Sequence, residues 1–109
     1  MIEGQLSEQI IGAAIEVHRH WGPGIYEEVY ERSLCRELSL RGIVHERQLQ
    51  LPLEYKGEHV GDGLRLDLWV NRKVVVEAKS VAQLLPIHEA QLLTYMRLTR
   101  SRVGLLINF

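Results

Sequence analysis

Two acidic residues and a lysine on two neighbouring predicted strands are the residues in this sequence most able to do chemistry together. Asp67 lies in the run Leu64–Val70, while Glu77 and Lys79 lie in the run Val74–Lys79. Successive side chains of a strand point to opposite faces of the sheet. In the first run Leu66, Leu68 and Val70 therefore share one face, and Arg65, Asp67 and Trp69 share the other. In the second run Val74, Val76 and Ala78 share one face, and Val75, Glu77 and Lys79 share the other.

The loop between the two strands decides whether these charged side chains meet. A three-residue loop at residues 71–73 pairs Val70 with Val74, and hence Asp67 with Glu77. Directly opposed residues of a hairpin have Cβ atoms about 4.5–5.5 Å apart. A two-residue turn would instead send Asp67 and Glu77 to opposite faces. We predict the three-residue loop, because it also brings the apolar faces of the two strands together.

Two carboxylates at this separation repel each other, which raises the pKa of one or both. A Mg²⁺ or Mn²⁺ ion would relieve the repulsion, since these ions prefer oxygen ligands and keep several waters. Asp67, Glu77 and a backbone carbonyl would suffice to hold one. Lys79 would then neutralise developing negative charge or orient an attacking water, as in the hydrolysis of a phosphodiester. A second interpretation stays open: the three charges are solvated, or form a cross-strand salt bridge.

The segments around this pair predict the elements that must position it. Apolar residues at helical spacing predict a helix from about Leu6 to Trp21, with Ser7 as its N-cap. A Gly-Pro-Gly break at 22–24 precedes a second helix, 25–41. A period-two strand follows from 43 to 55, and the glycine-rich segment 59–63 has no assigned element. After the two strands already named come a helix over 86–99 and a buried strand over 103–109.

The order α-α-β-β-β-α-β predicts the fold class: an α/β (mixed α+β) domain whose mixed sheet is flanked by helices. A chain of 109 residues has the size of one domain, which we assign to residues 1–109. Because the sequence stops at its last predicted strand, we also expect that a C-terminal segment is missing.

Composition excludes several classes of protein. No apolar run approaches the roughly 20 residues that span a bilayer, and the N-terminus lacks the pattern of a signal peptide. The single cysteine, Cys35, excludes an internal disulfide and fits a reducing compartment, so we expect a cytoplasmic protein with Cys35 as a buried thiol. The net charge is −1, but residues 1–55 carry −4 and residues 56–109 carry +3. That asymmetry alone would give only weak, salt-sensitive binding to phosphates.

Several motifs in order resemble a known family. Asp67 followed by Glu77-Ala78-Lys79 resembles the D…ExK signature of the PD-(D/E)XK nuclease superfamily, and the predicted element order is similar to the core of that superfamily. Gly24-Ile25-Tyr26-Glu27-Glu28-Val29-Tyr30 resembles the motif that names the GxxExxY protein family. Three more segments resemble that family, so that the likeness covers nearly the whole chain: residues 12–18, 88–95 and 104–109. Members of the family continue past the Asn-Phe pair with a basic segment.

The resemblance implies a role for each matching residue. It implies that Asp67, Glu77 and the carbonyl of Ala78 bind Mg²⁺ or Mn²⁺, and that Lys79 is catalytic. Glu27 matches an acidic position on an early helix that often points into such sites. Gln91 and Tyr95, which share a helix face, resemble a Q-x-x-x-Y motif that lines the DNA path in the nuclease domains of bacterial recombination helicase-nucleases. The implied activity is hydrolysis of nucleic acid, and the expected substrate is DNA.

Alternatives stay open at the level of the sequence. The same scaffold could be a catalytically silent module that binds nucleic acid or a protein, or a subunit whose site is completed in a homo-oligomer. Glu27 could be a solvated helix residue, and Gln91 and Tyr95 could serve helix packing. Trp69 could stack on a base or cover the sheet. His88 is the one histidine that we keep as a possible contact of the site.

Overall fold

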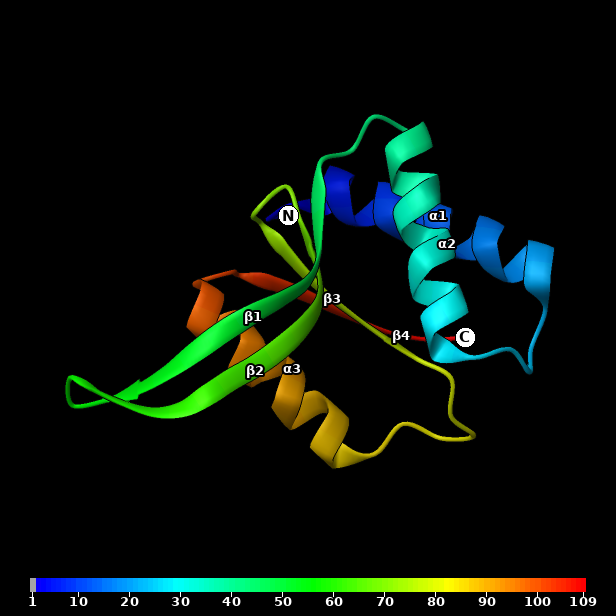
Figure 1. The fold of residues 1–109 in the computed structure, drawn as a ribbon. Helices are drawn as coiled ribbons and strands as arrows, with labels where there is room; N and C mark the ends of the chain where they lie inside the picture. Colours follow the sequence, from blue (N-terminus) through cyan, green and yellow to red (C-terminus); the bar gives the residue numbers. More distant parts are fainter. Residues whose placement is uncertain (1) are drawn as a thin grey trace.

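The computed structural model describes residues 2–109, and its elements follow the predicted order α-α-β-β-β-α-β (Figure 1). Helix α1 begins at Gly4, three residues before the predicted Ser7 cap, and α2 begins at Glu27. The predicted mixed α+β class is confirmed. The elements are α1 Gly4–Trp21, α2 Glu27–Leu40, β1 His45–Tyr55, β2 Glu58–Val70, β3 Val74–Lys79, α3 Pro86–Thr99 and β4 Val103–Asn108.

The four strands form one mixed sheet in the order β1-β2-β3-β4. Strands β1, β2 and β3 are antiparallel neighbours, whereas β4 is parallel to β3 because α3 carries the chain back across the sheet. Val70 pairs with Val74, as the predicted three-residue loop requires. Asn71 and Arg72 make the tight connection with positive φ angles of 51° and 52°.

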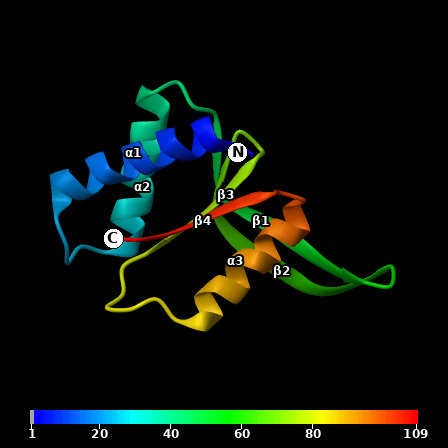
Figure 2. The ribbon, with the colours of Figure 1, turned by 180° about the vertical axis from the view of Figure 1, so that it is seen from behind.

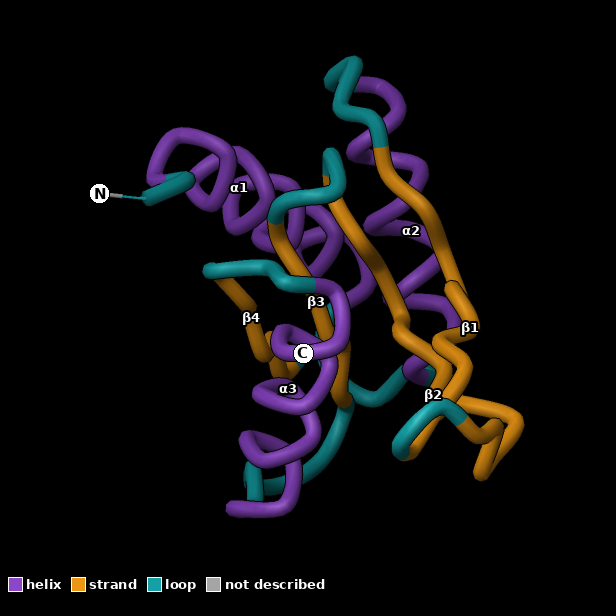
Figure 3. Tube along the Cα trace, turned by 90° about the vertical axis from the view of Figure 1, so that its left-hand side faces the viewer, coloured by secondary structure: helices purple, strands orange, loops and turns teal. Residues whose placement is uncertain are grey.

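The helices lie on both faces of the sheet. Figures 2 and 3 show α1 and α2 together on one side and α3 on the other. The buried residues of α1 recur at helical spacing, at Ile10, Ala13, Ala14 and Val17, and pack in a core with the strand residues Leu68, Val70, Val74 and Val76. A smaller core lies under α3 and joins Leu92 and Tyr95 to Leu66 and Val75.

Strand β2 does not keep strict alternation. The sequence predicts Leu66, Leu68 and Val70 on one face, but Leu66 packs in the core under α3 while Leu68 and Val70 pack under α1 and α2. This prediction was wrong because β2 changes face at Asp67, where its regular pairing with β3 has stopped.

Strands β1 and β2 extend past the rest of the sheet as a two-stranded arm, seen at the left of Figure 1. The segment 59–63, which had no predicted element, forms part of β2 in this arm. Gly63 has a φ of 101°, and a Cβ there would lie 2.1 Å from the carbonyl oxygen of Leu51. The glycine is needed because β1 bulges between Leu51 and Leu53, at Pro52, a residue that cannot donate a hydrogen bond to the ladder.

None of the helices among residues 2–109 combines the length and the apolar character that crossing a membrane requires.

Candidate functional site

Asp67 and Glu77 meet where β2 and β3 separate. Regular pairing of the strands ends at Leu68 and Val76. Beyond it, the backbone N–H of Asp67 donates to Oε1 of Glu77 at 3.1 Å, and the backbone N–H of Ala78 donates to Oδ2 of Asp67 at 3.1 Å. The two carboxylates thus accept bonds that backbone carbonyls would accept in a continuous ladder. The predicted meeting of Asp67 and Glu77 is confirmed as geometry.

Glu77 is buried and Asp67 is half-buried, and each perturbs the pKa of the other. Glu77 is 5% exposed, and its burial together with the charge of Asp67 raises its pKa to about 8. Burial also raises the pKa of Asp67, against the opposing effects of the Ala78 N–H and the Lys79 charge. The pair as a whole therefore holds a proton more tightly than two separate, solvated carboxyl groups would.

Lys79 lies two residues after Glu77 and so points to the same face of β3. Its positive charge lowers the pKa of both Asp67 and Glu77, which places the ammonium within reach of the pair. The carbonyl of Lys79 accepts a hydrogen bond from the N–H of Phe109 at 2.8 Å, just past the end of β4. The backbone under this lysine is thus fixed by the parallel strand.

The donors at this point suit a hard divalent cation. The N–H and C=O of one strand residue point to the same side, so the Ala78 carbonyl points toward Asp67 as its N–H does. Asp67, Glu77 and this carbonyl offer oxygen ligands alone, as Mg²⁺ and Mn²⁺ prefer. Across residues 2–109 no three His, Cys, Asp or Glu side chains gather to enclose an ion by themselves. The set therefore fits an ion that retains waters, and does not fit a closed structural zinc site.

Glu27 reaches the same end of β3 from the first turn of α2. Its Oε2 accepts a hydrogen bond from the N–H of Ser80 at 3.2 Å, and its charge raises the pKa of Asp67. The side chain is also exposed. The structure therefore supports part of each interpretation of Glu27: its side chain is solvated, and it lies at the rim of the Asp67–Glu77 pair.

Tyr30 fixes the start of α2 against the segment before it and against the end of the chain. Its hydroxyl donates to the carbonyl of Gly22 and accepts from the N–H of Ile25. Its ring is fully buried and stacks on Phe109, with centroids 4.6 Å apart and an interplanar angle of 6°. Since Phe109 is bonded to Lys79, the start of α2 and the end of β3 are held together.

The three residues of α3 that the sequence indicated, His88, Gln91 and Tyr95, lie in different surroundings. Tyr95 is buried, and its pKa is raised by burial and by the charges of Glu77 and Asp67, so it lies close to the pair. Gln91 lies one turn earlier and is exposed. His88 is used by the helix itself, because its Nδ1 accepts from the N–H of Leu85 at 3.0 Å.

Trp69 is used in packing. Its Nε1–H donates to Oγ of Ser101 at 3.0 Å, and the Arg72 guanidinium lies 4.9 Å from the centre of its ring. The ring also packs against the core under α3. The structure therefore favours the interpretation in which Trp69 covers the sheet.

Two residues that the sequence did not indicate lie beside Asp67. Glu31 is 5% exposed, and burial raises its pKa. Gln48 donates from Nε2 to Glu31 at 2.5 Å and approaches Asp67 Oδ1 at 3.4 Å. With Glu27, Arg47, Arg65 and neighbouring side chains they line a hollow of about 460 Å³. Glu31 follows Glu27 by four residues and so shares its helix face, which was the one available signal.

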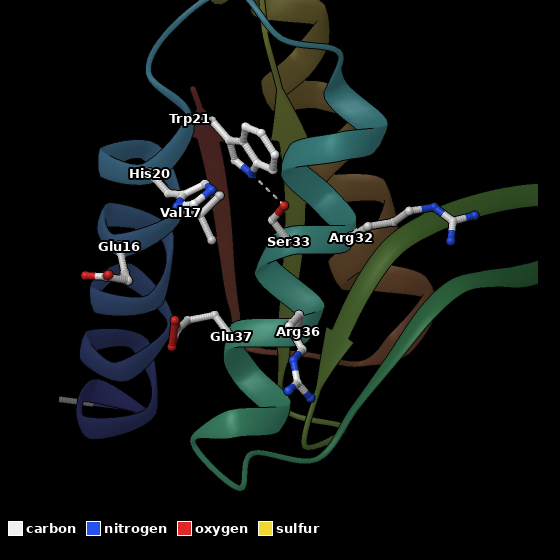
Figure 4. A pocket seen from close by; sticks show the side chains of 8 residues that line it. All are labelled: Glu16, Val17, His20, Trp21, Arg32, Ser33, Arg36 and Glu37. Atoms are coloured by element: carbon white, nitrogen blue, oxygen red, sulfur yellow. Dashed lines mark hydrogen bonds between the residues drawn. The ribbon is translucent and has the colours of Figure 1, made fainter.

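A second hollow, of about 360 Å³, lies between α1 and α2 (Figure 4). Trp21 donates from Nε1 to Oγ of Ser33 at 2.9 Å across it. None of the residues predicted for the site lines this hollow. The predicted site residues Asp67, Glu77, Lys79 and Glu27 lie instead at the open end of the β2–β3 pair, where the two strands separate.

Residues 4–109 match the family model of the PD-(D/E)XK nuclease superfamily. The chain belongs to this superfamily. Nucleases of this superfamily act on nucleic acid and generally use divalent metal ions. The comparisons with curated proteins and with solved structures found no match.

Proposed function

We propose that this chain is a Mg²⁺- or Mn²⁺-dependent nuclease that hydrolyses phosphodiester bonds of DNA. One observation carries the proposal: the buried Glu77 side chain lies against Asp67, at the place where the strands separate beside Lys79. Burying two carboxyl groups together is costly unless a partner relieves the repulsion. A divalent cation between them would do so.

Each residue of the pair has a separate part in this proposal. Asp67 and Glu77 would hold the ion with the carbonyl of Ala78, and the pair would release a proton on binding it. When bound, the ion would polarise the phosphate and make a coordinated water more acidic. Lys79 places its ammonium beside the reacting phosphate, where it stabilises negative charge that develops in the transition state.

Residues around the pair bind the substrate and the water. Glu27 lies at the rim, where its carboxylate can accept a hydrogen bond from the attacking water and orient it. Gln91 and Tyr95 are proposed to contact the nucleic acid from the α3 side, since Tyr95 lies near the pair and Gln91 is exposed on the same helix face. All these residues belong to one chain, so one domain would suffice.

A second candidate is a catalytically silent module on the same scaffold, which binds nucleic acid or a protein partner without cutting. The net charge of −1 gives little general attraction for phosphates, so this module would depend on a few specific contacts. Such a module would bind through the same hollow and would need no ion.

A cleavage assay with Lys79→Ala distinguishes the two functions. Linear single-stranded and double-stranded DNA would be incubated with Mn²⁺ or with a chelator. For a nuclease, wild type cleaves only with Mn²⁺, and the variant loses about 10²–10³ in turnover because a transition-state stabiliser is gone. Mn²⁺ affinity should survive, because the ligands of the ion remain.

Lys73→Ala is the matched control, since Lys73 is exposed at the closed end of the same strand pair. It should cleave as wild type does. Cleavage that resists the chelator, or that is equal in Lys79→Ala, would point to a contaminating enzyme and would remove the nuclease proposal.

A further inference from the structure

Gln48 adopts an unusual backbone conformation in the middle of a strand. Its φ is 54°, in the left-handed region that side-chain-bearing residues rarely enter. The pairs on either side keep one register, Arg47 with Leu68 and Leu49 with Leu66. Gln48 therefore lies opposite Asp67, at the step where β2 changes face. Strain of this kind persists where the surrounding contacts hold it, and it clusters at functional sites.

The side chain of Gln48 connects two acidic residues. Its Nε2 donates to Oε1 of Glu31 at 2.5 Å and lies 3.4 Å from Oδ1 of Asp67. A carboxamide carries two N–H hydrogens, so one nitrogen can serve both carboxylates. Glu31 is a firm anchor, because it is buried and lies 3.5 Å from the guanidinium Nε of Arg47.

The contact limits how the Asp67 carboxylate can turn. Oδ2 accepts from the Ala78 N–H, and Oδ1 faces Gln48. Two donors on two different oxygens fix the plane of a carboxylate better than either alone. An amide is also neutral, so it orients Asp67 without cancelling the negative charge that a cation needs. A lysine in the same place would cancel it.

We propose that Gln48 is a positioning residue: anchored on Glu31, it holds the Asp67 carboxylate in the orientation for binding a divalent cation together with Glu77. This inference rests on the proposed function, since it concerns the same ion. It adds a residue on β1, an element that contributes nothing to the D…ExK signature.

The test measures Mn²⁺ affinity directly, by the electron paramagnetic resonance signal of free Mn²⁺, with no substrate present. Gln48→Met keeps the length of the side chain and removes both donors. We expect it to weaken Mn²⁺ binding about 10-fold, in the range found for residues that orient metal ligands. Gln50→Met is the matched control: Gln50 is two residues further on in β1, and its amide donates to the carbonyl of Asp62 at 2.7 Å, in the arm. Its affinity should equal that of wild type.

Two variants of Glu31 test the anchor. Glu31→Gln retains an oxygen that accepts from Gln48, so Mn²⁺ affinity should stay within about twofold of wild type. Glu31→Leu removes the acceptor and should weaken binding about as much as Gln48→Met. The double variant Gln48→Met/Glu31→Leu should be no weaker than either single variant, because both changes break one connection.

A purely structural role for Gln48 predicts a different pattern. Gln48→Lys places a charge between Glu31 and Asp67, which should keep the urea midpoint of the metal-free protein at or above that of wild type. It should nevertheless lose Mn²⁺ binding at least as strongly as Gln48→Met. Affinity that follows only the unfolding midpoint across these variants would overturn the inference.

The wild-type measurement separates the two proposals. If wild type binds Mn²⁺ and Gln48→Met binds it within twofold, the positioning role is wrong and the proposed function stands. If wild type does not bind Mn²⁺ at all, the metal-dependent function is wrong, and the positioning role is wrong with it.

Discussion

The two ends of the β2–β3 pair differ in the side chains that they bury: apolar ones at the closed end, where the loop 71–73 joins the strands, and carboxyl groups at the open end, where the strands separate. At the closed end, Leu68, Val70, Val74 and Val76 are fully buried, and the backbones pair with each other. At the open end, one residue beyond Leu68, two carboxylates accept the hydrogen bonds of the opposite backbones. The same two strands thus change from apolar packing to buried acid within one residue.

The difference shows how this small fold divides stability from chemistry. Apolar burial at the closed end stabilises the fold without depending on a proton or an ion. The open end is favourable only while a proton or a cation occupies it, since the burial of Glu77 penalises its charged form. Changes at the first end should therefore cost stability, and changes at the second should alter how stability depends on protons and ions.

The largest expected effect on stability is at the closed end. Leu68→Ala leaves a cavity in the core under α1 and α2 and should lower the free energy of unfolding by about 2–5 kcal/mol. Urea denaturation would measure it. Asp67→Asn, at the adjacent position, should leave the metal-free protein as stable as wild type or more so, because it removes a buried charge. Equal losses for these two neighbours would show that the ends do not differ.

The next effect is the pH dependence of the open end. The pKa of Glu77 is about 8 in the folded chain, well above the 4.5 that is ordinary for a glutamate, so the folded state binds the proton more tightly. This stabilisation is complete below the unfolded pKa and is lost as pH rises through about 8, an effect on the order of 3 kcal/mol. Glu77→Gln should remove it, because glutamine mimics the protonated acid. Urea denaturation of both proteins between pH 5 and pH 8.5, without metal, would measure the difference.

The slope, and not the stability at one pH, is the decisive quantity here. Asp67 and Glu31 also have raised pKa values, so part of the decline should remain in Glu77→Gln. Identical slopes for wild type and Glu77→Gln would show that Glu77 titrates alike in the folded and unfolded chains.

A smaller effect is the gain from metal. By mass action, Mn²⁺ at roughly 100 times its dissociation constant should add about 2.7 kcal/mol to wild type. Leu68→Ala should show the same gain from its lower starting point, because its ligands are intact. Asp67→Asn should show none. Thermal unfolding across a Mn²⁺ titration at pH 7.5 tests all three, and an unchanged midpoint in wild type would count against a competent site.

Most of the fold could be predicted from patterns within single elements. The order of elements and the Val70–Val74 register followed from helical spacing, alternation and one loop length, all of which are local properties. The segment 59–63 had no predicted element, because it is too rich in glycine for its pattern to favour one. Its place in β2 depends on a bulge in another strand, where only a glycine fits against Leu51.

The candidate site divides in the same way. The sequence by itself predicted that Asp67 and Glu77 lie close together, because a three-residue loop sets the Val70–Val74 register and brings both residues to the same end of the hairpin. The placing of Glu27 at the rim depends on Tyr30, which ties α2 to Phe109 and so to Lys79 over long separations in the chain.

Only the tertiary structure decided the surroundings of the pair. Glu31 and Gln48 come from α2 and β1 and reach Asp67 because β1 kinks at Gln48 and β2 changes face opposite it. Neither event has a local signal, since a positive φ at a glutamine is stable only when contacts from other elements hold it. Burial acts in the same way: the sequence contains two carboxyl groups, but burial in the folded chain, together with the charge of Asp67, is what raises the pKa of Glu77.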